Sequence, residues 1–146
     1  MTPNEAKKTV LIVDDEDEFR QGICTALTKA GYEVFDSPSG PDAIVKVSQE
    51  HFNAIISDIR MPEMSGLDLV HVLGKLCEDT IVILLTAVPD PDSNLANLAK
   101  AAGVYAYLNK PCKIQELIDT MESGFAQQES SRAQLDFANG IHKLKI

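Results

Sequence analysis

The sequence predicts an α/β fold in which a doubly wound, five-stranded parallel sheet is covered by helices on both faces. Short apolar runs alternate with longer stretches whose apolar residues recur at helical spacing. The apolar runs are nearly continuous, which is typical of strands that are buried on both faces and therefore belong to a parallel sheet. Regular alternation of such strands with helices is the pattern of this fold class.

The expected strands are short and mostly apolar segments. The run 80–86, Thr-Ile-Val-Ile-Leu-Leu-Thr, is the most apolar of them. The complete set comprises residues 9–13, 33–36, 54–58, 80–86 and 104–108.

The expected helices lie between and after these strands. Glycine is a common residue just beyond a helix, so Gly31 and Gly103 are expected to end two of them. Ser65 is expected to cap one helix, and Asp92 or Ser93 the next. Two helices are thus expected to begin near these caps. The other predicted helices span residues 17–30, 39–50 and 114 to about 127.

Composition narrows the class of protein. The 146 residues fit a single domain, and 45% are hydrophobic. A net charge of -9 argues against nucleic-acid or anionic-membrane binding through the overall field and leaves a local basic patch as the remaining route. The three cysteines lack metal-type spacing, and the three histidines are scattered. No apolar run is long enough for a signal peptide or membrane span, so we expect a cytoplasmic protein.

Chemistry-bearing residues stand at the carboxyl ends of the predicted strands. Asp14 and Asp15 follow the first strand, Asp58 ends the third, Thr86 ends the fourth and Lys110 follows the fifth. Ligands of open α/β sheets bind outside the carboxyl ends of the strands. We therefore expect these residues, which are far apart in sequence, to share one crevice.

The residue types in this crevice indicate phosphoryl chemistry. Three carboxylates repel one another and need a cation, and hard oxygen ligands favour Mg²⁺, or Mn²⁺ in its place. Lys110 would supply a positive charge and Thr86 a hydroxyl donor to the oxygens of a phosphoryl group. A central Asp58 can then act as the nucleophile and form an acyl phosphate.

Four segments resemble the signature motifs of the response-regulator receiver family. They are Val13-Asp-Asp-Glu16, the segment from Asp58 to Gly66, Thr86-Ala87 and Lys110-Pro111. Each motif is weak alone, but together and in this order they are a strong signal. The resemblance covers residues 8–125 and implies the flavodoxin-like strand order 2-1-3-4-5.

The resemblance assigns roles in a metal and phosphorylation site. Asp58 would be the phosphoacceptor and a metal ligand. Asp15 would bind the metal directly, and Asp14 would act mainly through water. The backbone carbonyl of Arg60 would complete the metal site.

The resemblance also assigns residues to a readout, by which phosphorylation changes the shape of the surface that partners bind. Thr86 and Lys110 would sense the phosphoryl group, and Tyr107 would be the aromatic switch residue that follows Thr86. The Lys110–Pro111 peptide bond would be cis.

The implied function is a phosphorylation-dependent switch of a two-component system. A histidine kinase or phosphotransfer protein would supply the phosphoryl group in the presence of Mg²⁺. The domain would regulate rather than act as an enzyme, apart from self-catalysed phosphotransfer and dephosphorylation. A homodimer could form through the face made by the fourth helix, fifth strand and fifth helix, with no direct nucleic-acid or membrane contact. The alternative is a receiver-like interaction module that is not phosphorylated.

Two segments leave the readout open. Residues 126–146 could be a C-terminal helical extension, a frayed tail or a linker to an output domain that this sequence lacks. Pro89 and Pro91 follow Thr86 closely, and prolines restrict themselves and their predecessors. We therefore expect a stiff loop after the fourth strand.

Overall fold

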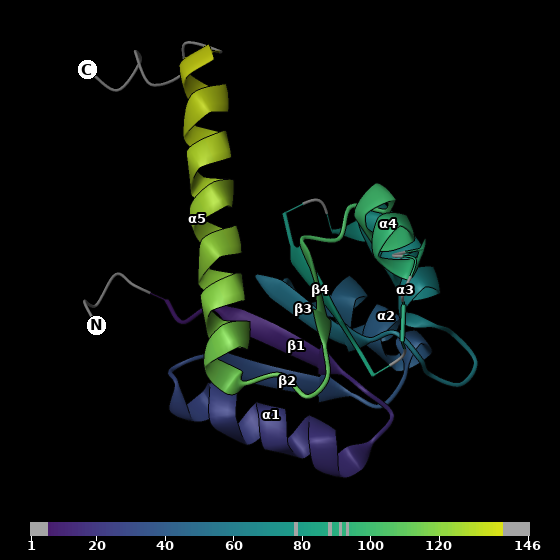
Figure 1. Cartoon of the computed structure of the whole chain (residues 1–146). Coiled ribbons are helices and arrows are strands. Elements are labelled where there is room, and N and C mark those ends of the chain that lie inside the picture. Colours follow the sequence, from purple (N-terminus) through teal and green to yellow (C-terminus); the bar gives the residue numbers. More distant parts are fainter. Residues whose placement is uncertain (1–5, 78, 88, 91, 93, 139–146) are drawn as a thin grey trace.

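Five parallel strands lie side by side in the order β2–β1–β3–β4–β5 (Figure 1). This computed structural model describes residues 6–77, 79–87, 89–90, 92 and 94–138. The predicted fold class and strand order are confirmed. The strands are β1 (Thr9–Val13), β2 (Glu33–Ser37), β3 (Ala54–Asp58), β4 (Ile81–Thr86) and β5 (Ala106–Asn109).

Helices cover both faces of this sheet. Helices α1 and α5 pack on one face, and α2, α3 and α4 lie on the other (Figure 1). Their bounds are α1 (Asp17–Lys29), α2 (Gly40–Gln49), α3 (Gly66–Leu76), α4 (Asn94–Ala101) and α5 (Ile114–Ala138).

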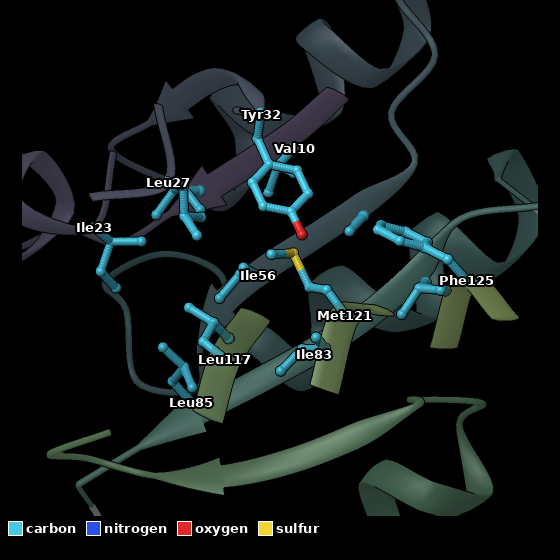
Figure 2. Packing of buried hydrophobic residues seen from close by; sticks show 13 residues of the cluster. Val10, Ile23, Leu27, Tyr32, Ile56, Ile83, Leu85, Leu117, Met121 and Phe125 are labelled. Atoms are coloured by element: carbon cyan, nitrogen blue, oxygen red, sulfur yellow. The ribbon is translucent and has the colours of Figure 1, made fainter. Parts of the chain in front are cut away.

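The first face holds the largest hydrophobic cluster. Val10, Ile56 and Ile83 project from three neighbouring strands toward Leu27 of α1 and Met121 of α5, and all five side chains are buried (Figure 2). Burial of a large aliphatic side chain contributes about 1.5–3 kcal/mol each. This cluster therefore fixes α1 and α5 against the sheet.

The other face is built from the alternate residues of the same strands. Leu11 and Ile55 pack with Leu69 of α3, while Leu84 packs near Ala99 of α4. Successive strand side chains point to opposite faces, so a strand covered on both faces must be apolar throughout. This explains why the sequence shows continuous apolar runs instead of alternation.

Most of the residues predicted to begin or end a helix lie at helix termini in the structure. Gly31 and Gly103 follow α1 and α4 with φ of 104° and 93°, a region that disfavours residues with a Cβ. Ser65 accepts a hydrogen bond from the Asp68 N–H at 3.1 Å, and its own N–H donates to the Asp68 carboxylate at 3.4 Å. This reciprocal pair is a capping box.

The start of α4 differs from the prediction. The carboxylate of Asp90, rather than that of Asp92, accepts hydrogen bonds from the N–H groups of Leu95 and Ala96, at 3.2 and 3.0 Å. Ser93, the other predicted cap, lies outside the described residues. The N–H groups of a first helical turn have no acceptor within the helix, and Asp90 supplies one for these two.

Helix α5 continues well past its predicted end near residue 127 and reaches Ala138. Polar contacts support the extension: the Gln128 amide donates to the Asp79 carbonyl at 2.7 Å, and Arg132 lies 3.8 Å from the Asp79 carboxylate. Apolar periodicity stops at Phe125, so the sequence left a helical extension as one of several possibilities for this segment, and it is the one that the described residues up to Ala138 adopt.

Two predicted features fall partly outside the described residues. The expected stiff loop includes Val88 and Pro91, and the apolar tail residues Ile141, Leu144 and Ile146 follow the described end of α5. Within the described part of the chain, no helix combines the length and apolar character that a membrane crossing needs.

Gly66 is constrained by close packing beside the end of β3. A Cβ at Gly66 would lie 2.5 Å from the Asp58 carbonyl oxygen and 2.9 Å from Ile59 Cα, and both are backbone atoms that cannot turn aside. The Gly66 N–H donates to the Ile59 carbonyl at 2.9 Å. Helix α3 can therefore begin directly against the strand only because residue 66 has no side chain.

Replacing Gly66 by Ala is expected to lower the free energy of unfolding by about 2–3 kcal/mol, through overpacking against rigid backbone. Gly74→Ala is the matched control, because Gly74 lies in the same helix and a Cβ added there would meet no neighbouring atom within 4 Å. That change should stabilise by about 0.5–1 kcal/mol through helix propensity. Urea denaturation of both variants measures the difference, and equal stability of the two would contradict the packing argument.

Candidate functional site

The carboxyl edge of the sheet brings together the five residues singled out at the strand ends. Asp14 and Asp15 follow β1, Asp58 closes β3, Thr86 closes β4 and Lys110 follows β5. One carboxylate oxygen from each of the three aspartates lies within 4.8 Å of the other two. Parallel pairing explains the gathering, because it makes neighbouring strands end at the same edge.

Asp14 is the buried member of the acidic cluster, with 2% of its side chain exposed. One of its oxygens accepts a hydrogen bond from the Glu16 N–H at 2.9 Å, and the other accepts from Lys110 Nζ at 3.0 Å. Asp15, by contrast, is exposed. The two consecutive aspartates therefore have different environments.

Lys110 reaches across the cluster from the end of β5. Its Nζ lies 3.0 Å from Asp14 Oδ2 and 3.6 Å from Asp58 Oδ2. Its backbone N–H donates to the Thr86 carbonyl at 2.8 Å, which fixes the start of the side chain. The Lys110–Pro111 peptide bond is cis, as expected.

Burial raises the pKa of Asp58, and the negative charge of Asp14 adds to the effect. The ammonium of Lys110 opposes this rise, as do hydrogen bonds from the backbone N–H groups of Ile59 and Arg60. Asp58 thus lies in an environment where one further positive charge would be favourable.

Thr86 and Tyr107 lie next to each other at the β4–β5 pair. Thr86 is fully buried, and Tyr107 pairs across the sheet with Leu84, two residues earlier in β4. Burial raises the pKa of Tyr107, the charge of Asp90 raises it further, and interaction with the Thr86 side chain lowers it. The two residues expected to form the readout are therefore close enough to affect one another.

The expected role of Arg60 concerns its backbone. Its side chain is exposed, and its N–H interacts with the Asp58 carboxylate. The participation of its carbonyl in a metal site stays a prediction.

Arg20 is a site residue that the sequence reasoning missed. It is buried, and it donates to the Asp14 carbonyl at 2.7 Å, to the Asp36 carboxylate at 2.7 Å and to the Asp17 carboxylate at 2.8 Å. A signal was present, because Arg20 precedes Ile23 by three residues and therefore occupies the buried face of α1.

Phe19 follows the helical spacing of the apolar residues in α1, which favours a place in the core. It does pack against the α1–α5 cluster, but its ring also lies under Lys110, with Nζ 3.9 Å from the ring centroid. Nothing in the local sequence relates these two residues, which come from opposite ends of the chain.

The donor set fits a hard divalent cation. Three carboxylates converge, and the described residues contribute no histidine or cysteine to the cluster. Oxygen ligands of this kind suit Mg²⁺ or Mn²⁺, and Mg²⁺ needs just one or two protein carboxylates. The three cysteines, Cys24, Cys77 and Cys112, are free thiols.

Comparisons with known proteins agree with this geometry. The family model of the response regulator receiver domain matches residues 10–122. The chain is 29% identical over 119 residues to the response regulator receiver protein CpdR of Brucella abortus, covering 79% of this chain and 94% of CpdR. It is 31% identical over 134 residues to the probable transcriptional regulator ycf27 of Cyanophora paradoxa, covering 92% of this chain and 55% of that protein.

A solved structure of the chemotaxis protein CheY4 of Vibrio cholerae is also similar. The TM-score is 0.74 at 32% identity, with 81% of this chain and 98% of that chain covered. The chain thus matches nearly the full length of CpdR and CheY4 but spans about half the length of the transcriptional regulators, 55% of ycf27 and 46% of TcrX from Mycobacterium tuberculosis.

Replacing Asp58 by Asn is expected to raise the thermal unfolding midpoint by about 3 °C at neutral pH in metal-free buffer, because one of three crowded charges is removed. Since the pKa of Asp58 is raised in the folded protein, its ionisation destabilises the fold as pH rises through that pKa. The gain should therefore shrink below the ordinary aspartate pKa, where folded and unfolded chains both carry the proton.

Calorimetry over a pH series measures this effect. Asp119→Asn is the control, because Asp119 is an exposed carboxylate on α5, and it should give no comparable gain. An Asp58→Asn variant no more stable than wild type at neutral pH would contradict the charge-crowding argument.

Proposed function

This chain belongs to the response regulator receiver family of two-component signalling, and we propose that it is a switch that accepts a phosphoryl group on Asp58. The observation that carries the proposal is the arrangement around Asp58, where two further carboxylates converge and the Lys110 ammonium lies 3.6 Å away. A central carboxylate between a cation site and a lysine is suited to attack phosphorus.

We assign Mg²⁺, with Mn²⁺ as a substitute, to the acidic cluster. Asp15 and Asp58 would bind it directly, with the Arg60 carbonyl completing the set. Asp14 would act through water, because both of its oxygens already accept hydrogen bonds, from Glu16 and Lys110. When bound, the cation would neutralise negative charge on the transferring phosphoryl oxygens.

The side chains of this chain perform the transfer in the proposed mechanism. A carboxylate oxygen of Asp58 attacks the phosphorus of a phosphohistidine on a histidine kinase or phosphotransfer protein. The P–N bond breaks, its electron pair stays on the imidazole, and an acyl phosphate forms on Asp58. Lys110 would pair with one phosphoryl oxygen, and the Thr86 hydroxyl would donate to another.

The proposed readout begins at the end of β4. Movement of Thr86 toward the phosphoryl group would change the packing of Tyr107, whose side chain interacts with that of Thr86. The face formed by α4, β5 and α5 would then favour a different partner, or a second copy of the chain. A partner shifts this equilibrium only as far as its affinities for the two shapes differ.

Residues 8–125 form the switch in this proposal, and the chain beyond Phe125 connects it to output. The described part of that segment, up to residue 138, continues α5. DNA binding, which the names of the transcriptional relatives suggest, would belong to their additional length and not to the matched region.

Incubation with acetyl phosphate and Mg²⁺ is expected to add one phosphoryl group to the wild-type chain, detected by intact mass. Asp58→Asn should gain none, because the nucleophile is gone, while Asp119→Asn should react like wild type. No mass gain in wild type would favour the alternative of an unphosphorylated interaction module.

Addition of Mg²⁺ without a phosphodonor is expected to raise the thermal unfolding midpoint of wild type. At a concentration about a hundredfold above the dissociation constant, binding stabilises the folded state by about 2.7 kcal/mol. Asp15→Asn should lose most of this response, because it removes a direct ligand, and Asp119→Asn should keep it. A full response in Asp15→Asn would show that the metal binds elsewhere.

A further inference from the structure

We propose that Phe19 is a positioning residue whose ring face holds the Lys110 ammonium in the crevice beside Asp58. Lys110 Nζ lies 3.9 Å from the centroid of the Phe19 ring, well within the range of a cation–π interaction. The inference rests on the proposed function, because it gives Phe19 a role through the lysine that pairs with the phosphoryl group.

Among the described residues, three partners surround the ammonium. Asp14 is the nearest at 3.0 Å, Asp58 lies at 3.6 Å, and the Phe19 ring supplies the third contact. A lysine side chain has many rotamers, and holding it in one place costs conformational free energy. The ring restricts this freedom without taking part in a hydrogen bond.

The ring itself is held by the hydrophobic core. Phe19 lies in the first turns of α1 and packs against the cluster that joins α1 and α5 to the sheet, in which Ile23 and Leu117 are buried. The position of the Lys110 head group is thereby tied to the packing of the core. A fully exposed side chain at this position would not hold the Lys110 ammonium in one place.

An aromatic face allows the Lys110 ammonium to change its hydrogen-bond acceptor on phosphorylation. Before phosphorylation, Nζ donates to Asp14, and afterwards it has to donate to a phosphoryl oxygen on Asp58. A carboxylate in place of the ring would compete with the phosphoryl group for the ammonium. The π face attracts the cation broadly, so Lys110 can exchange hydrogen-bond partners while it stays on the ring. The side chain of Lys110 is just 12% exposed, which limits replacement of this contact by water.

Phe19→Leu and Phe19→Tyr, made in the full chain, test the proposal. Phe19→Leu keeps an apolar side chain but removes the π face, and the phosphorylation rate constant at saturating acetyl phosphate and Mg²⁺ should fall about three- to tenfold. Phe19→Tyr retains the face, and its rate should stay within about twofold of wild type. NMR should show the Lys110 ε-methylene protons shifted upfield by the ring in wild type and Phe19→Tyr, and not in Phe19→Leu.

Fluorinated phenylalanine at position 19 separates the cation–π attraction from the packing of the ring. Added ring fluorines weaken the π face with little change of shape, so the rate should fall stepwise with each fluorine at position 19. Phe125 is the matched control, because its ring lies 5.1 Å from Lys8 Nζ in a cation–π contact that does not involve Lys110. The same series at position 125 should leave the phosphorylation rate unchanged.

The outcomes distinguish the two proposals. If wild type gains no phosphoryl group, the proposed function fails, and the positioning role fails with it. If wild type is phosphorylated but Phe19→Leu reacts at the wild-type rate, or fluorination at position 19 has no effect, the positioning role alone is overturned.

Discussion

The carboxylates of Asp14, Asp15 and Asp58 converge within 4.8 Å, and the ammonium of Lys110 is a positive charge that lies between two of them. Like charges at such distances repel by several kcal/mol at the effective dielectric of a partly buried site, about 4 kcal/mol per pair at 4 Å. The attraction of Lys110 for Asp14 and Asp58 offsets part of this repulsion. Continuous apolar strands that are buried on both faces supply free energy that holds the charges together, so the site depends on the burial of the parallel sheet.

Helix α1 is the second support of this charged edge. Arg20 holds the backbone of Asp14 through its carbonyl and joins it to Asp36 of β2, while Phe19 lies against Lys110. Consecutive residues of one helical turn thus contact the acidic and the basic component of the site. A shift of α1 on the sheet would disturb both, so the core beneath α1 determines the geometry of the crevice as well as the stability of the fold.

The sequence predicted the strand ends well because a buried strand has a clear pattern and because parallel strands end at a common edge. It did not predict the roles of Arg20 and Phe19, since those depend on contacts with Asp14 and Lys110 that follow from packing. The cap formed by Asp90 was missed because the contact crosses an irregular loop. The length of α5 was left open, with a helical extension as one possibility, because Gln128 and Arg132, which attach its later turns to Asp79, are polar and leave no apolar periodicity.

Asp90 connects the charged edge to the face proposed for readout. Its carboxylate caps the first turn of α4 through Leu95 and Ala96, and its charge also acts on Tyr107 of β5. Thr86 stands at the beginning of the same loop and interacts with Tyr107, so α4 and β5 share a set of contacts that begins beside Asp58. Helix α5 is held differently, by the core and by Asp79 before β4, at the opposite edge of the sheet. This division favours a readout in which α4 and Tyr107 change position relative to α5, with α5 as the fixed element of the face.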